Sequence, residues 1–185
     1  YEEENKKIEI DFINLNDFYK KKNEFTDEDL KIFISENKDR LKIEYIDFNY
    51  AIINPKNLIG IDEYNQSFFD KIDQIEIDIS NEVEFNTIVS NLNITPVNVA
   101  NFKLSSDKNV VEQKIFELRN NKFDIFENDN NYILYKINNI EQKEPNLSDG
   151  QTKNEIIELI SRKNKFDFNR SLLEKIGNKK FNDND

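Results

Sequence analysis

The sequence of 185 residues contains no cysteine, no histidine and no methionine, and it holds only three glycines and three prolines. Without cysteine, disulfide bonds, thiolate metal sites and thiol nucleophiles are excluded. Without histidine, the chain lacks the commonest metal ligand and the usual general base near neutral pH, so most hydrolase triads and zinc sites are excluded too. The acidic run DIFENDNN lacks the glycine and closing glutamate of a calcium loop. We therefore expect no metal and no cofactor.

Positive charge is also scarce, because 26 Lys and Arg residues face 37 Asp and Glu residues, which gives a net charge of −11. The one dense run of lysines is YKKKN, at residues 19–23. Binding to nucleic acid or to an anionic membrane surface needs a larger basic patch, so we expect neither. No apolar run approaches the roughly 20 residues of a membrane helix. Because methionine is missing, we expect a fragment or processed form whose signal or anchor would lie upstream.

Apolar residues are present in sufficient number for a packed core. Hydrophobic types make up 37% of the chain and include 15 Phe and 7 Tyr, although 34% of the residues are charged. A chain of this length and composition is expected to form one domain of ordinary size or two small lobes.

Hydrophobic spacing predicts an α+β fold. Period-two alternation predicts strands, which we place at residues 7–15, 42–53 and 96–104 and, as a hairpin around a polar turn, at 122–126 and 132–140. Helical spacing predicts helices at about 27–38, within 62–80 and 84–93, at about 108–119, and after Pro145 as far as Gly177. Thr26 is a suitable N-cap for the first helix, since three acidic residues follow it.

From residue 42 onward the expected order is strand, helix, helix, strand, helix, strand, strand. This order resembles a parvulin-type peptidyl-prolyl isomerase domain. The segment VVEQKIFELRNNKFDIFENDNNYILYKI resembles the closing part of that family, with Phe116 and Leu118 at its F-x-L pair and Tyr132 in its last strand. Upstream, FTDEDLKIFISENKDRLKIEYIDF resembles the segment that precedes parvulin domains in the bacterial SurA and PpiD group. The resemblance covers roughly residues 25 to 175.

The resemblance implies a degenerate parvulin-like domain over residues 42–142. A strand-helix segment, 1–41, would precede it, and a C-terminal helical segment, 143–185, would pack with that segment as a second small lobe. The family's two catalytic histidines are replaced by Tyr45 and Ile133, and Val111 and Asp107 stand where a phenylalanine and a methionine line the proline pocket. Isomerases must lower a barrier of about 18–20 kcal/mol. Without the histidine pair and the aromatic floor of the pocket, no residues remain to do this, so we predict no significant isomerase activity.

By resemblance, the expected function is that of a periplasmic folding chaperone, or part of one, which binds unfolded or extended envelope proteins without catalysis. Full-length members of the PpiD kind carry a membrane anchor outside the region that this chain resembles. The candidate client-contact residues are Tyr45, Phe102, Val111, Tyr132 and Ile133. The plainer interpretation of Tyr45 and Ile133 is that they are core or sheet-surface residues.

Two alternatives remain open at this point. The chain is either such a chaperone or an inert structural or protein-interaction module of a bacterial envelope protein with one fixed partner; an enzyme of unknown type has the least support. Likewise, the aromatic-rich segment YNQSFFDKI has more apolar residues than one helical stripe can bury. These residues either pack against a neighbouring lobe or form an exposed apolar groove for unfolded chains.

Overall fold

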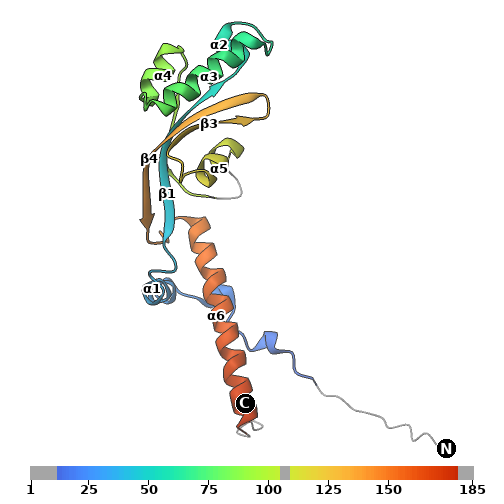
Figure 1. The fold of residues 1–185 in the computed structure, drawn as a ribbon. Helices are drawn as coiled ribbons and strands as arrows, with labels where there is room; N and C mark the ends of the chain where they lie inside the picture. Colours follow the sequence, from blue (N-terminus) through green and yellow to red (C-terminus); the bar gives the residue numbers. More distant parts are fainter. Residues whose placement is uncertain (1–11, 105–108, 179–185) are drawn as a thin grey trace, which may run out of the picture. The chain divides into compact units, whose positions relative to one another are not determined.

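The computed structural model describes residues 12–104 and 109–178 (Figure 1). The fold is α+β, as the hydrophobic spacing predicts, with a four-stranded antiparallel sheet and several helices among these residues. The chain divides into two compact units. One is continuous, Lys42–Lys143, and the other combines the described residues up to Leu41 with those from Glu144 onward.

The continuous unit is organised by one sheet with the strand order β2-β1-β4-β3. Its strands are β1 (Ile43–Ile53), β2 (Val97–Phe102), β3 (Phe123–Asn128) and β4 (Asn131–Lys143). The expected hairpin is confirmed, because β3 and β4 pair up to Asn128 opposite Asn131. Asp129 in the two-residue turn has a φ of 52°, a left-handed conformation that Asp and Asn tolerate better than most residues.

Outside residues 105–108, four helices accompany this sheet: α2 (Pro55–Ile59), α3 (Gln66–Ser80), α4 (Phe85–Asn91) and α5 (Val110–Glu117). The helix expected within 62–80 begins only at Gln66, because the Asn65 side chain caps it by accepting from the backbone N–H of Phe68. Hydrophobic spacing missed α2, which is only five residues long and is started by Asn54 as N-cap and Pro55 at its first turn. Residues 105–108, at the start of the helix predicted from about 108, lie outside the described residues.

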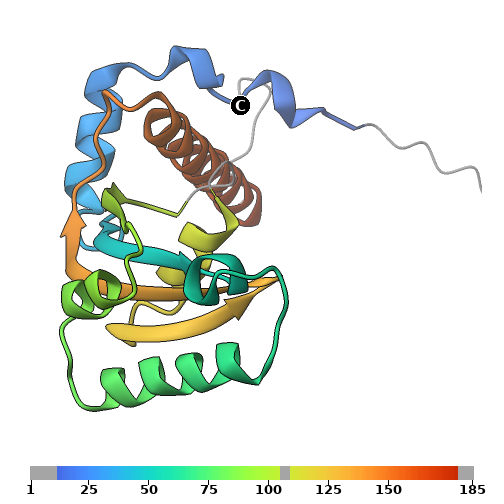
Figure 2. The same cartoon turned by 90° about the horizontal axis from the view of Figure 1, so that it is seen from above.

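Two apolar clusters cover the two faces of the sheet, as alternation along the strands requires. On one face, Ile46 and Phe48 of β1 pack with Ile115 of α5. On the other face, Ala51 and Ile53 pack with residues of α3 and α4. Figure 2 shows α3, in green, and α5, in olive-yellow, on opposite sides of the sheet.

The described residues of the second unit form two short 3-10 turns and two α-helices: η1 (Leu15–Asp17), η2 (Lys22–Glu24), α1 (Asp27–Glu36) and α6 (Gly150–Gly177). The first predicted helix is confirmed as α1, with Thr26 and Asp29 in a reciprocal capping box. The strand predicted at 7–15 is wrong for its described part, since Asn14 caps a 3-10 turn there. Residues 7–11 of that prediction lie outside the described residues.

The C-terminal helical region is one continuous helix of 28 residues rather than several helices. Neither Gly nor Pro interrupts it between its two terminal glycines, so nothing in the sequence forces a break. Its Ile156 completes the core of this unit with Leu30, Phe33 and Ile34 of α1. Across the described ranges, none of the helices combines the length and the apolar character that crossing a membrane requires.

Candidate functional site

The five predicted client-contact residues do not form one surface. Phe102 and Ile133 are only 3% and 1% exposed and belong to the core cluster on the α5 face of the sheet. Val111 is partly buried and packs against the same cluster. Phe102 and Ile133 are therefore unavailable to a client in the folded protein, and the plainer interpretation of Ile133 as a core residue holds.

Tyr132 and Tyr45 lie apart from that cluster. The side chain of Tyr132, in β4, lies on the opposite face of the sheet, where its ring centroid is 5.7 Å from that of Phe68 in α3. Tyr45, near the start of β1, is half-buried, and the ammonium of Lys143 lies 5.3 Å from its ring centroid. Tyr132 thus faces away from its neighbour Ile133, and Tyr45 lies at the opposite end of β1 from Ile53, the residue that pairs with Tyr132.

Tyr64, just before α3, and Phe69, in its first turn, form a small exposed aromatic patch. Phe68 is buried, while Tyr64 and Phe69 are 43% and 40% exposed and stack on each other with centroids 6.1 Å apart. The Tyr64 hydroxyl donates a hydrogen bond to the backbone carbonyl of Asn130 in the β3–β4 turn. Tyr64 is consequently held against the hairpin and is not free to reorient around a ligand.

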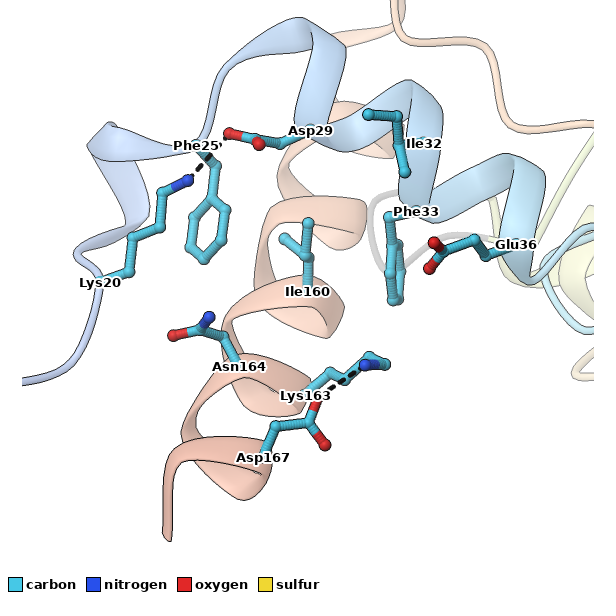
Figure 3. A pocket seen from close by; sticks show the side chains of 10 residues that line it. All are labelled: Lys20, Phe25, Asp29, Ile32, Phe33, Glu36, Ile160, Lys163, Asn164 and Asp167. Carbon is cyan, nitrogen blue, oxygen red and sulfur yellow. Dashed lines mark hydrogen bonds and ion pairs between the residues drawn. The ribbon is translucent and has the colours of Figure 1, made fainter. Parts of the chain in front are cut away.

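A better-formed hollow lies in the other unit, between α1, the segment before it and α6 (Figure 3). Its volume is about 220 Å³. Its floor is apolar and consists of Phe25, Ile32 and Phe33 from one side and Ile160 of α6 from the other. Figure 3 shows Ile160 between the rings of Phe25 and Phe33. Ile32 remains 50% exposed, so a large aliphatic side chain is available to a ligand.

The local sequence explains why these residues converge. Thr26 follows the turn η2 and Phe25 and starts α1, which directs Phe33 toward α6 and leaves its neighbour Ile32 at the open side. On the second helix, Ile156 and Ile160 are four residues apart and therefore share one face. Lys153 joins the two helices at one end through a 2.6 Å ion pair with Asp27.

Two ion pairs stand at the rim of the hollow. Lys20 and Asp29 are 2.9 Å apart, and Lys163 and Asp167 are 2.6 Å apart. The backbone N–H of Thr26 and then the Lys20 ammonium lower the pKa of Asp29 to about 2. The hydrogen bond to Asp167 raises the pKa of Lys163. Both shifts favour the charged forms of Asp29 and Lys163.

Two further polar residues, Glu36 and Asn164, complete the rim. An apolar floor with paired charges around it is suited to holding an apolar side chain while its polar backbone stays near the rim. Within residues 12–104 and 109–178, no cluster of three or more Asp or Glu side chains is placed to hold a metal ion. The hollow is therefore a candidate binding surface, with an apolar floor and ion pairs at its rim.

Sequence reasoning missed this hollow. Its two sides come from residues 20–36 and 160–167, and one sequence does not show that these segments meet. The available signal was local: Ile32, Phe33 and Ile34 are three consecutive large apolar residues on a short helix, and one apolar stripe is too narrow to bury all three.

Comparison of the chain with protein-family models, with curated proteins and with solved structures finds no match. The interpretation of the site therefore depends on its own geometry.

Proposed function

We propose that the chain is a non-catalytic polypeptide-binding module of the kind found in periplasmic parvulin-domain chaperones. The observation that carries this proposal is the hollow between α1 and α6, where the half-exposed Ile32 and the neighbouring Phe25 form an apolar surface beside fixed ion pairs. An extended segment of an unfolded protein would place an apolar side chain on this floor and leave its backbone at the polar rim.

The size of the hollow favours a side chain over a whole small-molecule ligand. Pockets for drug-sized ligands usually measure about 300–1,000 Å³, whereas this one is about 220 Å³. Burying one leucine- or phenylalanine-sized side chain contributes about 1.5–3 kcal/mol. Binding at this site alone is therefore weak and reversible, which is appropriate for a protein that holds many different unfolded segments for a short time.

The order of elements in Lys42–Lys143 supports the resemblance to a parvulin domain. Strand β1 is followed by helices, β2, α5 and the β3–β4 hairpin, and α2 is the one addition to the expected order. In this proposal the unit is a degenerate parvulin-like domain without significant isomerase activity. Ile133, at the position of an expected histidine, has a hydrocarbon side chain that is 1% exposed and can neither donate nor accept a proton.

The decisive experiment measures how well the chain suppresses aggregation of a chemically denatured client and binds an array of extended peptides. Ile32→Glu places a charge on the floor of the hollow at a half-exposed position, so the fold should be retained. Val110→Glu is the matched control, because Val110 is 69% exposed in the other unit. We expect Ile32→Glu to weaken both activities at least fivefold and Val110→Glu to leave them unchanged.

Equal activity of the two variants would disprove the role of the hollow. No suppression by the unmodified chain, together with one tight stoichiometric partner, would favour an interaction module instead. The periplasmic location is tested separately, by fractionating cells that express the full-length protein.

A further inference from the structure

The outer face of α6 carries an exposed apolar stripe. Leu159, Phe166 and Leu173 are spaced seven residues apart, which places them on one side of the helix. They are 40%, 64% and 67% exposed. This stripe is distinct from the hollow beside α1, which uses Ile160, Lys163, Asn164 and Asp167 of the same helix.

The surroundings of Phe166 and Leu173 are basic although the chain is acidic, whereas Glu155 and Glu158 lie near Leu159. Between residues 162 and 177 there are five Lys or Arg residues and two Asp or Glu residues, whereas the whole chain has a net charge of −11. Arg162 and Arg170 flank Phe166 on the same face, one helical turn away on either side. Arg170 pairs with Glu174 of its own helix at 3.1 Å, but both side chains are more than 60% exposed, so this pair is weak and can exchange.

The complementary surface lies on α3. Its buried side consists of Phe68, Ile72 and Ile75, and its opposite side is exposed. On that exposed side, Phe69 and Ile77 are 40% and 52% exposed. Helical spacing places Asp73 between Phe69 and Ile77, with Asp70 and Glu76 at the edges of the same face. This face therefore combines two apolar side chains with three acids.

We propose that α6 of one copy of this chain docks along α3 of a second copy. The stripe from Leu159 to Leu173 covers 15 residues, or about 22 Å at 1.5 Å per residue. The helix Gln66–Ser80 is equally long, and the exposed face from Phe69 to Ile77 lies in its middle part, so it can accept the central part of the stripe. Phe166 would pack between Phe69 and Ile77, and the two flanking arginines would lie near the acids of α3.

Like charges disfavour the simpler symmetric pairings. Two antiparallel α6 helices centred on Phe166 would bring Arg162 of one copy beside Arg170 of the other, and two α3 faces would bring acids together. The favoured contact therefore joins two different surfaces. Such a contact either occurs twice in a closed twofold dimer, with α6 of each copy on α3 of the other, or continues head to tail into rings or chains. A single helix-on-helix contact is small, so we expect weak association that salt reduces.

The test uses sedimentation velocity of the full chain from about 10 to 500 µM, at low and high salt. We expect the weight-average sedimentation coefficient to rise with concentration at low salt and to rise much less at high salt. Phe166→Ala should weaken association at least fivefold without changing any charge. The variant Arg162→Glu/Arg170→Glu and the variant Asp73→Lys/Glu76→Lys should each remain monomeric alone, because each makes its two faces alike in charge.

Mixing those two charge-reversed variants should restore association, since the acidic α6 of one then meets the basic α3 of the other. Asp62→Lys/Glu63→Lys, in the exposed loop before α3, is the matched control and should associate like the unmodified chain. The proposal is overturned if the unmodified chain stays monomeric up to 500 µM, or if the mixture stays monomeric. It is also overturned if the stripe instead binds vesicles containing phosphatidylglycerol and Arg162→Glu/Arg170→Glu abolishes only that binding.

Discussion

The hydroxyl of Tyr19 donates a 2.9 Å hydrogen bond to Oδ1 of Asn169, a residue 150 positions further along the chain. Around this bond the Tyr19 ring meets Phe168 edge to face, with centroids 5.6 Å apart, and the Lys165 ammonium lies 5.1 Å from the Tyr19 ring centroid. Further along the same segment, Lys22 pairs with Glu158. These contacts hold the segment before α1 against α6 and so form one wall of the candidate binding hollow.

We expect Tyr19→Phe to lower the stability of the terminal unit by about 0.5–1.5 kcal/mol, the usual net contribution of one hydrogen bond. Hydrogen exchange of the backbone amides near residues 18–25 measures the effect locally, without assuming that both units unfold together. Tyr45→Phe is the control, because the Tyr45 hydroxyl forms no hydrogen bond among the described residues, where its ring contacts Lys143. Equal exchange in both variants would show that the bond to Asn169 contributes nothing.

The strands of the sheet unit could largely be predicted because their residues alternate clearly. The alternation of Ile46, Phe48 and Tyr50 with polar neighbours identified β1, and these three residues are buried on one face. The same kind of alternation failed at residues 12–15. Alternation reports which residues could share a face, whereas a strand also requires a hydrogen-bonding partner.

The candidate site could be predicted much less well than the fold. Phe25 and Ile160 line one hollow although 135 positions separate them, and local periodicity contains no information about such contacts. Phe102 and Ile133 were placed in the correct strands. The sequence did not indicate, however, that residues of α5 pack over both side chains and bury them. Secondary structure follows from neighbouring residues, and a binding surface follows from the packing of distant ones.

Introducing the missing histidine should not create an isomerase. Ile133→His would place an imidazole among the buried side chains around Phe102 and Phe48. We expect this substitution to lower the free energy of unfolding by about 1–3 kcal/mol. Burial favours the neutral imidazole and lowers its folded-state pKa, so the variant should lose further stability as the pH falls below about 6.5, the unfolded value.

Ile52→His is the matched control, since Ile52 pairs directly with Ile133 across the two strands and is 41% exposed. Ile52→His should lower the free energy of unfolding clearly less than Ile133→His does, and its stability should show little additional pH dependence. Denaturant unfolding at pH 5 and pH 8 measures both effects, and a proline-peptide assay measures activity. Isomerase activity in the unmodified chain, or its appearance in Ile133→His, would contradict the proposed loss of catalysis.

Acid should weaken the terminal unit through Asp29. Its pKa is lowered from 3.8 to about 2, first by the backbone N–H of Thr26 and then by Lys20. A carboxyl group with a lowered folded-state pKa stabilises the protein above its unfolded pKa and loses that contribution as the pH falls through the folded value. We expect the stability of this unit to decline between pH 4 and pH 2, and Asp29→Asn to reduce that decline.

Glu28→Gln is the control, because it removes the same charge one position away in the first turn of α1. The stability of this variant should decline more between pH 4 and pH 2 than the stability of Asp29→Asn does. Carbon-detected NMR titration of the Asp29 carboxyl gives its pKa directly. A measured value near 3.8 would mean that neither Thr26 nor Lys20 stabilises the charged form.

Alkali should weaken the sheet unit through Tyr135, which is fully buried and donates a 3.0 Å hydrogen bond to the backbone carbonyl of Asn121. Burial raises its pKa from 10.0 to about 12. Because the folded-state pKa lies above the unfolded one, the stabilisation is complete below pH 10 and is lost as the pH rises toward 12.

Tyr135→Phe should lower the free energy of unfolding by about 1 kcal/mol at neutral pH and show a shallower decline in stability above pH 10. Denaturant unfolding at pH 7 and pH 11 tests this, with the absorbance of tyrosinate near 295 nm as a direct measure of ionisation; ionisation of all tyrosines near pH 10 in the folded protein would contradict it.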